Sequence, residues 1–441
     1  MLIVRIVYQA AIAVVRVLSP VLSLGTSKLA RGMEGRRHAH DKLAAWGGTL
    51  RDPHRPVVWF HAPSVGEGLQ ARAVKDALVS RLPDVQVVFT FFSPSAEKLA
   101  DAFGADVTAY LPWDLRGPVS RVLDGLHPEA VVFTKTEIWP VVIAEARRRA
   151  IPSVIVGATV PEGAGRAGWP ARLLMRESWA SLSLACAISD EDAARLTELG
   201  VPPEAVVDTG DPAIDSAAMR FDAAPADAPY LTPFRARPRP TVVAGSTWAS
   251  DEAVLLRAMD RIRQDVQDVR LVVAPHEPTP DHMARLLQEL AALGWRTATL
   301  TDVEIDDGAS GPPRDGPSAD AVVVDRVGVL AHLYGVASVS FVGGGFHDHG
   351  LHSVLEPAAA RTPVAFGPRH GNSRAAADLV EVGGAKVAKN PVELSAILLQ
   401  WLQNEASRKR AAGAAFEYIQ RHRGASERTA LRLERIIRSS A

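Results

Sequence analysis

The chain has 441 residues, with 49 lysines and arginines against 50 aspartates and glutamates, so its formal net charge at neutral pH is −1. This length exceeds what one hydrophobic core organises and predicts two domains, while the balanced charge, without a basic stripe, argues against nucleic acid as a partner. The single cysteine, Cys186, excludes an intrachain disulfide and favours a reducing compartment.

The N-terminal segment, residues 1–45, is predicted to lie on a membrane surface. Its uninterrupted apolar run between Arg5 and Arg16 is shorter than the roughly 20 residues that span a bilayer. On a helical wheel Arg5, Gln9 and Arg16 share one narrow wedge, and apolar residues occupy the rest. Residues 1–42 also carry seven lysines and arginines, an excess that favours an anionic leaflet. A buried domain helix remains an alternative, and Arg16 argues against a signal peptide.

Short β-branched runs alternate with amphipathic helical stretches from residue 57 onward. This alternation is typical of βαβ units and a parallel sheet, so residues 46–220 are predicted to form one α/β domain. Its strand candidates are residues 57–62, 85–92, 107–111, 130–134, 153–158 and 184–189.

A second α/β domain is predicted over residues 241–405. The stretch 221–240 contains five prolines and little periodicity, which is typical of a linker. Residues 301–320 are rich in Gly, Pro, Asp and Ser and predict a mobile surface loop. The tail, 406–441, predicts charged, solvated helix. The second set of strand candidates is 241–246, 269–275, 321–325, 338–345, 362–368 and 384–388.

Chemistry in such domains is expected in the loops that follow the strands. In "VAGSTWASDE", Ser246 and Thr247 follow a strand where a helix would begin, and such a site can hold a phosphate. An ordinary helix N-cap is the alternative reading. His276, which also ends a strand, could donate to a phosphate or only cap its loop.

The stretch 343–373, "GGGFHDHGLHSVLEPAAARTPVAFGPRHGNS", is the most informative. Gly344 and Gly345 follow a strand and would let a ligand approach the backbone closely. In nucleotide-sugar enzymes of paired α/β domains, a carboxylate at the place of Glu356 accepts hydrogen bonds from ribose hydroxyls. The histidines are dense here, but no acidic or cysteine partner completes a recognisable ligand set, so no metal is expected. They are His347, His349, His352 and His370.

The first domain offers two further loops. "SVGE" (64–67) matches a capping box, in which Ser64 and Glu67 would exchange hydrogen bonds with each other's backbone; a catalytic base is the alternative. Lys135 and Glu137 follow another strand, and Glu137 could simply favour a helix dipole.

Nine motifs in chain order resemble the Kdo transferase family, whose members move 3-deoxy-D-manno-octulosonic acid (Kdo) from CMP-Kdo onto a lipid A precursor. The resemblance covers nearly the whole chain to about residue 405. The motifs are "HAPSVGE", "TFFSPSA", "YLPWDL", "KTEIWP", "VAGSTWASDE", "APHEP", "VGGGF", "GLHSVLEPAA" and "FGPRHGN".

The resemblance implies a glycosyltransferase B fold, in which two Rossmann-like domains face a cleft. The first would bind mainly the acceptor and the second mainly CMP-Kdo, with inversion, no metal and no cofactor. It also implies lipopolysaccharide biosynthesis at the cytoplasmic face of the bacterial inner membrane, with peripheral or monotopic attachment. Glu67 falls on the family's general base, and Ser64, Lys135 and Glu137 fall on the acceptor side. The nucleotide-facing positions are Ser246, Thr247, His276, Gly344, Gly345, Glu356 and Asn372.

Three departures leave the exact acceptor open. Ser353 stands where the family usually has Asn, Ala213 stands near a usual basic residue, and residues 157–163 replace an Arg-bearing segment. Two other functions remain as alternatives: a transferase or epimerase that uses a UDP- or GDP-sugar, and a catalytically silent scaffold at the membrane.

Overall fold

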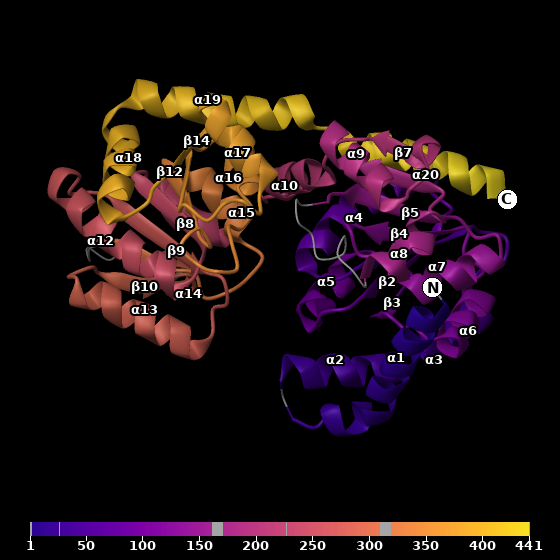
Figure 1. Cartoon of the computed structure of the whole chain (residues 1–441). Coiled ribbons are helices and arrows are strands. Elements are labelled where there is room, and N and C mark those ends of the chain that lie inside the picture. Colours follow the sequence, from indigo (N-terminus) through magenta and orange to yellow (C-terminus); the bar gives the residue numbers. More distant parts are fainter. Residues whose placement is uncertain (1, 26, 161–170, 226, 309–318, 441) are drawn as a thin grey trace. The chain divides into compact units, whose positions relative to one another are not determined.

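The structure is a computed structural model that describes residues 2–25, 27–160, 171–225, 227–308 and 319–440. The chain forms two compact units (Figure 1). Unit 1 consists of Met1–Ser216 and Arg423–Ala441, and unit 2 consists of Ala217–His422. The C-terminal end of the chain therefore returns to the unit in which the chain began.

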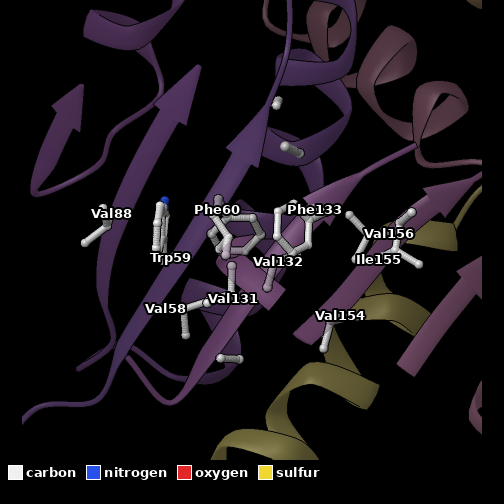
Figure 2. Close-up of a cluster of buried hydrophobic side chains, with 14 of the residues drawn as sticks. Val58, Trp59, Phe60, Val88, Val131, Val132, Phe133, Val154, Ile155 and Val156 are labelled. Atoms are coloured by element: carbon white, nitrogen blue, oxygen red, sulfur yellow. The ribbon is translucent and has the colours of Figure 1, made fainter. Parts of the chain in front are cut away.

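Unit 1 is built on a parallel sheet of seven strands in the order β3-β2-β1-β4-β5-β6-β7. Its central strands are buried along their whole length, as expected for a sheet covered on both faces. Figure 2 shows part of this core, with Trp59 and Phe60 on β1 and Phe133 on β4, which pairs with β1. The strands are β1 (Val57–Ala62), β2 (Gln86–Phe91), β3 (Val107–Tyr110), β4 (Ala130–Thr134), β5 (Ser153–Ala158), β6 (Leu184–Ala187) and β7 (Val206–Asp208).

Helices connect these strands, and three more precede the first strand. Pro140, at the first position of α7, is one local reason for a helix start, because proline fixes φ where no N–H is needed. The helices are α1 (Leu2–Leu22), α2 (Lys28–Arg37), α3 (Ala39–Thr49), α4 (Val65–Arg81), α5 (Glu97–Ala102), α6 (Arg116–Leu126), α7 (Pro140–Arg148), α8 (Ala171–Trp179), α9 (Asp190–Leu199) and α20 (Ala425–Ser440).

Unit 2 repeats this architecture with strand order β10-β11-β9-β8-β12-β13-β14, again all parallel. The strands are β8 (Thr241–Thr247), β9 (Arg270–Pro275), β10 (Thr297–Thr299), β11 (Ala321–Val323), β12 (Val339–Val342), β13 (Val364–Phe366) and β14 (Ala385–Val387). The helices are α11 (Thr232–Ala236), α12 (Ala249–Asp265), α13 (Pro280–Ala292), α14 (Leu300–Gly308), α15 (Leu330–Leu333), α16 (Leu355–Ala359), α17 (Arg374–Glu381), α18 (Pro391–Gln403) and α19 (Glu405–His422), while α10 (Pro212–Asp222) spans the boundary between the units.

The structure divides the chain at points that differ from the predicted boundaries. Residues 221–240 belong to unit 2, because Leu231 and Phe234 are buried in its core. The predicted tail is split between the units, with α19 in unit 2 and α20 in unit 1. The solvated-helix prediction is wrong for α20, which packs on α4 with Leu433 fully buried. Residues 301–308 of the expected loop belong to α14, and 309–318 lie outside the described residues.

Each sheet has one point at which the strand order reverses, between β1 and β4 in unit 1 and between β8 and β12 in unit 2. Loops at the carboxyl ends of strands part at such a point and leave a crevice, the usual ligand site of open α/β sheets. Glu67, at the start of α4, and Lys135 follow β1 and β4; Ser246 lies at the end of β8, and Gly344 follows β12. These four predicted residues therefore lie at the two switch points, whereas His276 follows β9 and Asn372 follows β13.

Candidate active site

Glu67 lies in the first turn of α4, directly after β1 and Ser64, the N-cap residue. Within the described chain, the Ser64 side chain makes no cap hydrogen bond to the backbone; its hydroxyl instead donates to the Glu67 carboxylate. The reciprocal capping box is therefore not formed. The Glu67 side chain remains 21% exposed, so a reacting group can approach it.

Lys135 meets Glu67 across the switch point of unit 1. Its backbone is left-handed, with φ of 61°, and its N–H donates to the Val156 carbonyl at 2.9 Å. This conformation, uncommon outside glycine, sends the Nζ atom to 3.8 Å from Glu67 Oε1. The structure thus brings together Ser64, Glu67 and Lys135. Glu137 follows in the same loop and is half-buried.

A buried cation lies in the same unit and was missed by the sequence reasoning. The Arg36 guanidinium, from α2, covers the Phe92 ring at 3.4 Å from its centroid and donates to the Phe92 carbonyl at 3.1 Å. Burial lowers the pKa of Arg36 to about 10, and the charge of Glu137 acts in the opposite direction. Its partners are 56 residues away in the chain, so no local pattern could have indicated the contact.

His61 is a buried histidine that supports this region. The Trp139 indole N–H donates to His61 Nε2 at 3.2 Å, so the ring proton resides on Nδ1, which donates to the Thr90 carbonyl at 3.0 Å. Burial lowers the pKa of His61 to about 3, so the ring is neutral at pH 7. Trp139 in turn stacks on Phe92 at 5.4 Å. His61 orients aromatic side chains and is not available as a proton acceptor.

In unit 2, the fully buried Asp251 joins the two loops at the switch point. Its carboxylate accepts the backbone N–H of Trp248 at 2.9 Å, of Gly344 at 2.8 Å and of Phe346 at 3.0 Å. Burial raises the pKa of Asp251, and these three N–H donors oppose that effect. Asp251 thereby fixes the glycine loop against the start of α12.

The glycines of this loop allow backbones to pack directly against one another. A Cβ at Gly343 would lie 2.3 Å from the Ser246 carbonyl oxygen, and one at Gly345 would lie 2.4 Å from the Gly367 nitrogen. Gly344 has φ of 91°, in the region that favours glycine. The loops after β8, β12 and β13 thus form one close-packed platform.

Thr247 is turned away from this platform. Its side chain is buried, and its hydroxyl donates to Glu252 at 2.8 Å. The buried Glu252 carboxylate also meets His282 at 2.8 Å and Arg285 at 2.5 Å. A phosphate at this helix start would consequently contact the Thr247 backbone and not its hydroxyl. Ser246 is half-buried and has a left-handed backbone, with φ of 54°.

A stack of aromatic rings connects three loops of unit 2. Trp248 stacks on His347 at 4.4 Å and on His276 at 4.6 Å, and His276 stacks on His352 at 4.4 Å. The Trp248 indole N–H also donates to His352 Nε2 at 3.0 Å. Burial lowers the pKa of His352 to about 4, so this ring is neutral at pH 7. Among the described residues, no cluster of three or more His, Cys, Asp or Glu is arranged as a metal site.

The remaining predicted residues have partners of their own. The Arg220 guanidinium donates to Glu356. Burial raises the pKa of the Tyr334 phenol, and the nearby charge of Glu356 adds to that effect. Asn372 accepts the Leu351 N–H at 3.0 Å and donates to the Leu351 carbonyl at 2.9 Å, so its amide holds the loop that ends the glycine-rich stretch.

Two of the three departures can be placed. The Ala213 N–H donates to Asp211 at 2.8 Å, and the Ser353 hydroxyl accepts a long bond from the Leu355 N–H at 3.4 Å. Of residues 157–163, the last three lie outside the described residues.

Comparison with solved structures shows the fold. The UDP-GlcNAc 2-epimerase from Neisseria meningitidis bound to UDP-GlcNAc aligns with a TM-score of 0.61 at 12% identity, covering 87% of this chain and 100% of that one. A glycosyltransferase from Rickettsia africae aligns with a TM-score of 0.56 at 10% identity, covering 88% and 99%. With the two seven-stranded parallel sheets, these similarities confirm the predicted glycosyltransferase B fold.

Sequence comparison shows the family. A family model for 3-deoxy-D-manno-octulosonic-acid transferase matches residues 37–216. The 3-deoxy-D-manno-octulosonic acid transferase of Haemophilus influenzae is 27% identical over 390 residues, covering 86% of this chain and 87% of its own. That of Bordetella pertussis is 30% identical over 447 residues, covering 98% of this chain and 99% of its own. The chain therefore belongs to the family of 3-deoxy-D-manno-octulosonic acid transferases, which are glycosyltransferases.

Proposed function

We propose that the protein transfers Kdo from CMP-Kdo to a lipid A precursor in lipopolysaccharide biosynthesis, with inversion and without a metal ion. An acceptor hydroxyl attacks the anomeric carbon of Kdo, the bond from that carbon to the phosphate oxygen breaks, and CMP departs with the electron pair. Glu67 takes the proton of the attacking hydroxyl.

The observation that carries this proposal is the placement of the Glu67 carboxylate and the contacts that it makes. It is not engaged as a helix cap, it lies at the switch point of unit 1, and its nearest charged partner is the Lys135 ammonium at 3.8 Å. The hydroxyl of Ser64 orients one of its oxygens. A partly exposed, oriented carboxylate at the carboxyl edge of a sheet has the placement that a general base requires.

The donor is assigned to the platform of unit 2. The platform adjoins the start of α12, a helix of 17 residues whose unpaired first-turn N–H groups and dipole favour a phosphate. Asp251 uses three N–H groups to hold the loops in place, so the platform is organised before a ligand arrives. Ser246, His276, Gly344, Gly345 and Glu356 are the residues we assign to CMP-Kdo, with Asn372 supporting their loop.

Attachment to the membrane surface is assigned to α1. One face of this helix is tied to unit 1, where Arg5 pairs with Glu177 at 2.6 Å and the Tyr8 hydroxyl donates to Asp114 at 2.8 Å. The other face exposes apolar residues such as Val14 and Val17, which are 58% and 77% exposed. Such a two-faced helix fits the headgroup region of a bilayer.

The length of α1 was underestimated, because the prediction counted only the residues between Arg5 and Arg16. In the part of the chain that the structure describes, Val4–Leu22 is the one helix long and apolar enough to cross a bilayer, by length and composition alone. We assign surface attachment in spite of this length, since the Arg5 and Tyr8 contacts hold α1 along unit 1.

Donor binding separates the proposal from its nearest enzymatic alternative. Calorimetric titration of the full chain with CMP and with UDP, each with and without EDTA, should show tighter binding of CMP that is insensitive to the chelator. Preferred binding of UDP would assign the site to a UDP-sugar enzyme of the same fold. A protein that binds CMP-Kdo but neither transfers nor hydrolyses it would instead be a silent scaffold.

A further inference from the structure

A groove of about 1000 Å³ lies in unit 1 between α1, the start of α6, α7 and the end of α8. Its apolar walls come from Ile6, Ala10 and Ala13 on α1 and from Ile143 and Ala144 on α7. The lining does not include Glu67, Lys135 or their neighbours in the candidate active site. The groove is therefore a separate feature that the proposed transfer reaction does not use.

The groove carries an excess of positive charge. Four arginines line it, at positions 5, 116, 147 and 148, against only Glu145 and Glu177, which leaves a net charge of +2. Glu145 is 4% exposed and is already shared by Arg116 at 3.4 Å and Arg148 at 3.0 Å. Within the described chain, the side-chain partner of Arg147 is the Ser181 hydroxyl at 3.4 Å. That hydroxyl itself donates to the Glu177 carbonyl at 2.6 Å, so the guanidinium groups are the donors that favour a phosphate.

The groove is continuous with the surface that we assign to the membrane. Ile6, 58% exposed, and the exposed Ala10 belong both to the groove wall and to the apolar face of α1. A ligand with both a phosphate and an acyl chain could leave the bilayer along this wall without exposing its chain to water.

We propose that this groove binds one anionic glycerophospholipid of the bilayer. Its phosphate lies between Arg147 and Arg148, and one acyl chain runs along Ile6 and Ala10. The inference rests on the proposed membrane attachment through α1 but not on the chemistry at Glu67. The bound lipid would fix the depth and orientation of unit 1 at the surface.

Native mass spectrometry of the full chain from detergent, with phosphatidylglycerol or phosphatidylcholine added, tests the site directly. We expect one retained phosphatidylglycerol and at least fivefold less phosphatidylcholine. The double variant Arg147→Ala, Arg148→Ala should lose this preference, because each basic residue near an anionic lipid contributes about a fivefold factor. The variant Ala144→Phe keeps every arginine but narrows the groove, and it should also lose the retained lipid.

The matched control removes two exposed arginines of α12 in unit 2, Arg257→Ala and Arg261→Ala, and should retain the lipid. Equal loss in the control, no preference of the wild type for phosphatidylglycerol, or full retention in Ala144→Phe would each overturn the proposal. Displacement of the phospholipid by an equimolar lipid A precursor would reassign the groove to the acceptor. Kdo transfer to an acceptor in detergent micelles should stay within twofold in both groove variants, and its absence in the wild type would refute the proposed function alone.

Discussion

Replacing Glu67 by glutamine distinguishes a catalytic base from a structural residue. The change keeps the size of the side chain and an oxygen that can accept the Ser64 hydroxyl, but removes the negative charge and the proton-accepting carboxylate. The ion pair that is lost joins partly exposed groups, 38% for Lys135 and 21% for Glu67, at 3.8 Å. Such pairs contribute about 1 kcal/mol or less to stability, whereas a general base accounts for roughly 100-fold or more in rate.

We therefore expect Glu67→Gln to lower kcat for Kdo transfer at least about 100-fold, with the free energy of unfolding changed by less than about 1 kcal/mol. The assay pairs single-turnover transfer, followed by mass spectrometry, with urea unfolding of the same preparation. Glu393→Gln is the control, since Glu393 also lies in the first turn of a helix and accepts a backbone N–H. A loss below tenfold in Glu67→Gln, or equal losses in both variants, would contradict the base assignment.

Three further predictions concern stability and attachment. Burial lowers the pKa of His61 from 6.5 to about 3, so below pH 6.5 the unfolded state binds a proton that the folded state does not. The free energy of unfolding should therefore fall by about 2 kcal/mol between pH 8 and pH 5 because of this histidine. His61→Asn should show a correspondingly shallower dependence of that free energy on pH. Gly345→Ala should destabilise the protein by about 1–3 kcal/mol and weaken CMP binding, because its Cβ would meet the Gly367 backbone, whereas Gly371→Ala, with open space around it, should be near neutral in thermal unfolding. Val14→Asp combined with Val17→Asp should release the protein from vesicles in a flotation assay, and the control pair Val327→Asp, Val392→Asp, whose valines are also exposed, should not; retention of the α1 variant would refute the assignment.

The central strands were predictable because a parallel strand that is buried on both faces has a continuous apolar sequence, as in 57–62 and 130–134. The two missed strands, β7 and β10, have three residues each and no fully buried position, so they lack that signal. The five prolines of 221–240 led to the linker prediction, although Leu231 and Phe234 of this segment are buried in the core of unit 2.

The helix α20 could have been predicted to pack. Its buried residues Ala430, Leu433 and Ile437 recur at helical spacing and form an apolar face. The prediction of a solvated helix relied on the surrounding arginines and overlooked this face.

The position of Glu67 at a strand-to-helix junction was predictable, but its freedom from capping was not. "SVGE" specifies a possible capping box, and only the placement of Ser64 and Lys135 in space shows that the box is not formed. Contacts between residues that are far apart in the sequence could not be predicted either, such as those of Arg36 with Phe92 and of Asp251 with Gly344. These contacts decide which polar groups are available to a ligand, and they depend on which loops the sheet order brings together.

The most direct test of the central claim is the mass of the lipid product. The full chain is incubated with CMP-Kdo generated in situ and a tetraacylated lipid A precursor, and the lipid is analysed by mass spectrometry beside a Glu67→Gln control. The account predicts a product heavier by one or more Kdo residues with the wild type and almost none with Glu67→Gln. No Kdo on the lipid acceptor with the wild type, or equal product with both proteins, would contradict it.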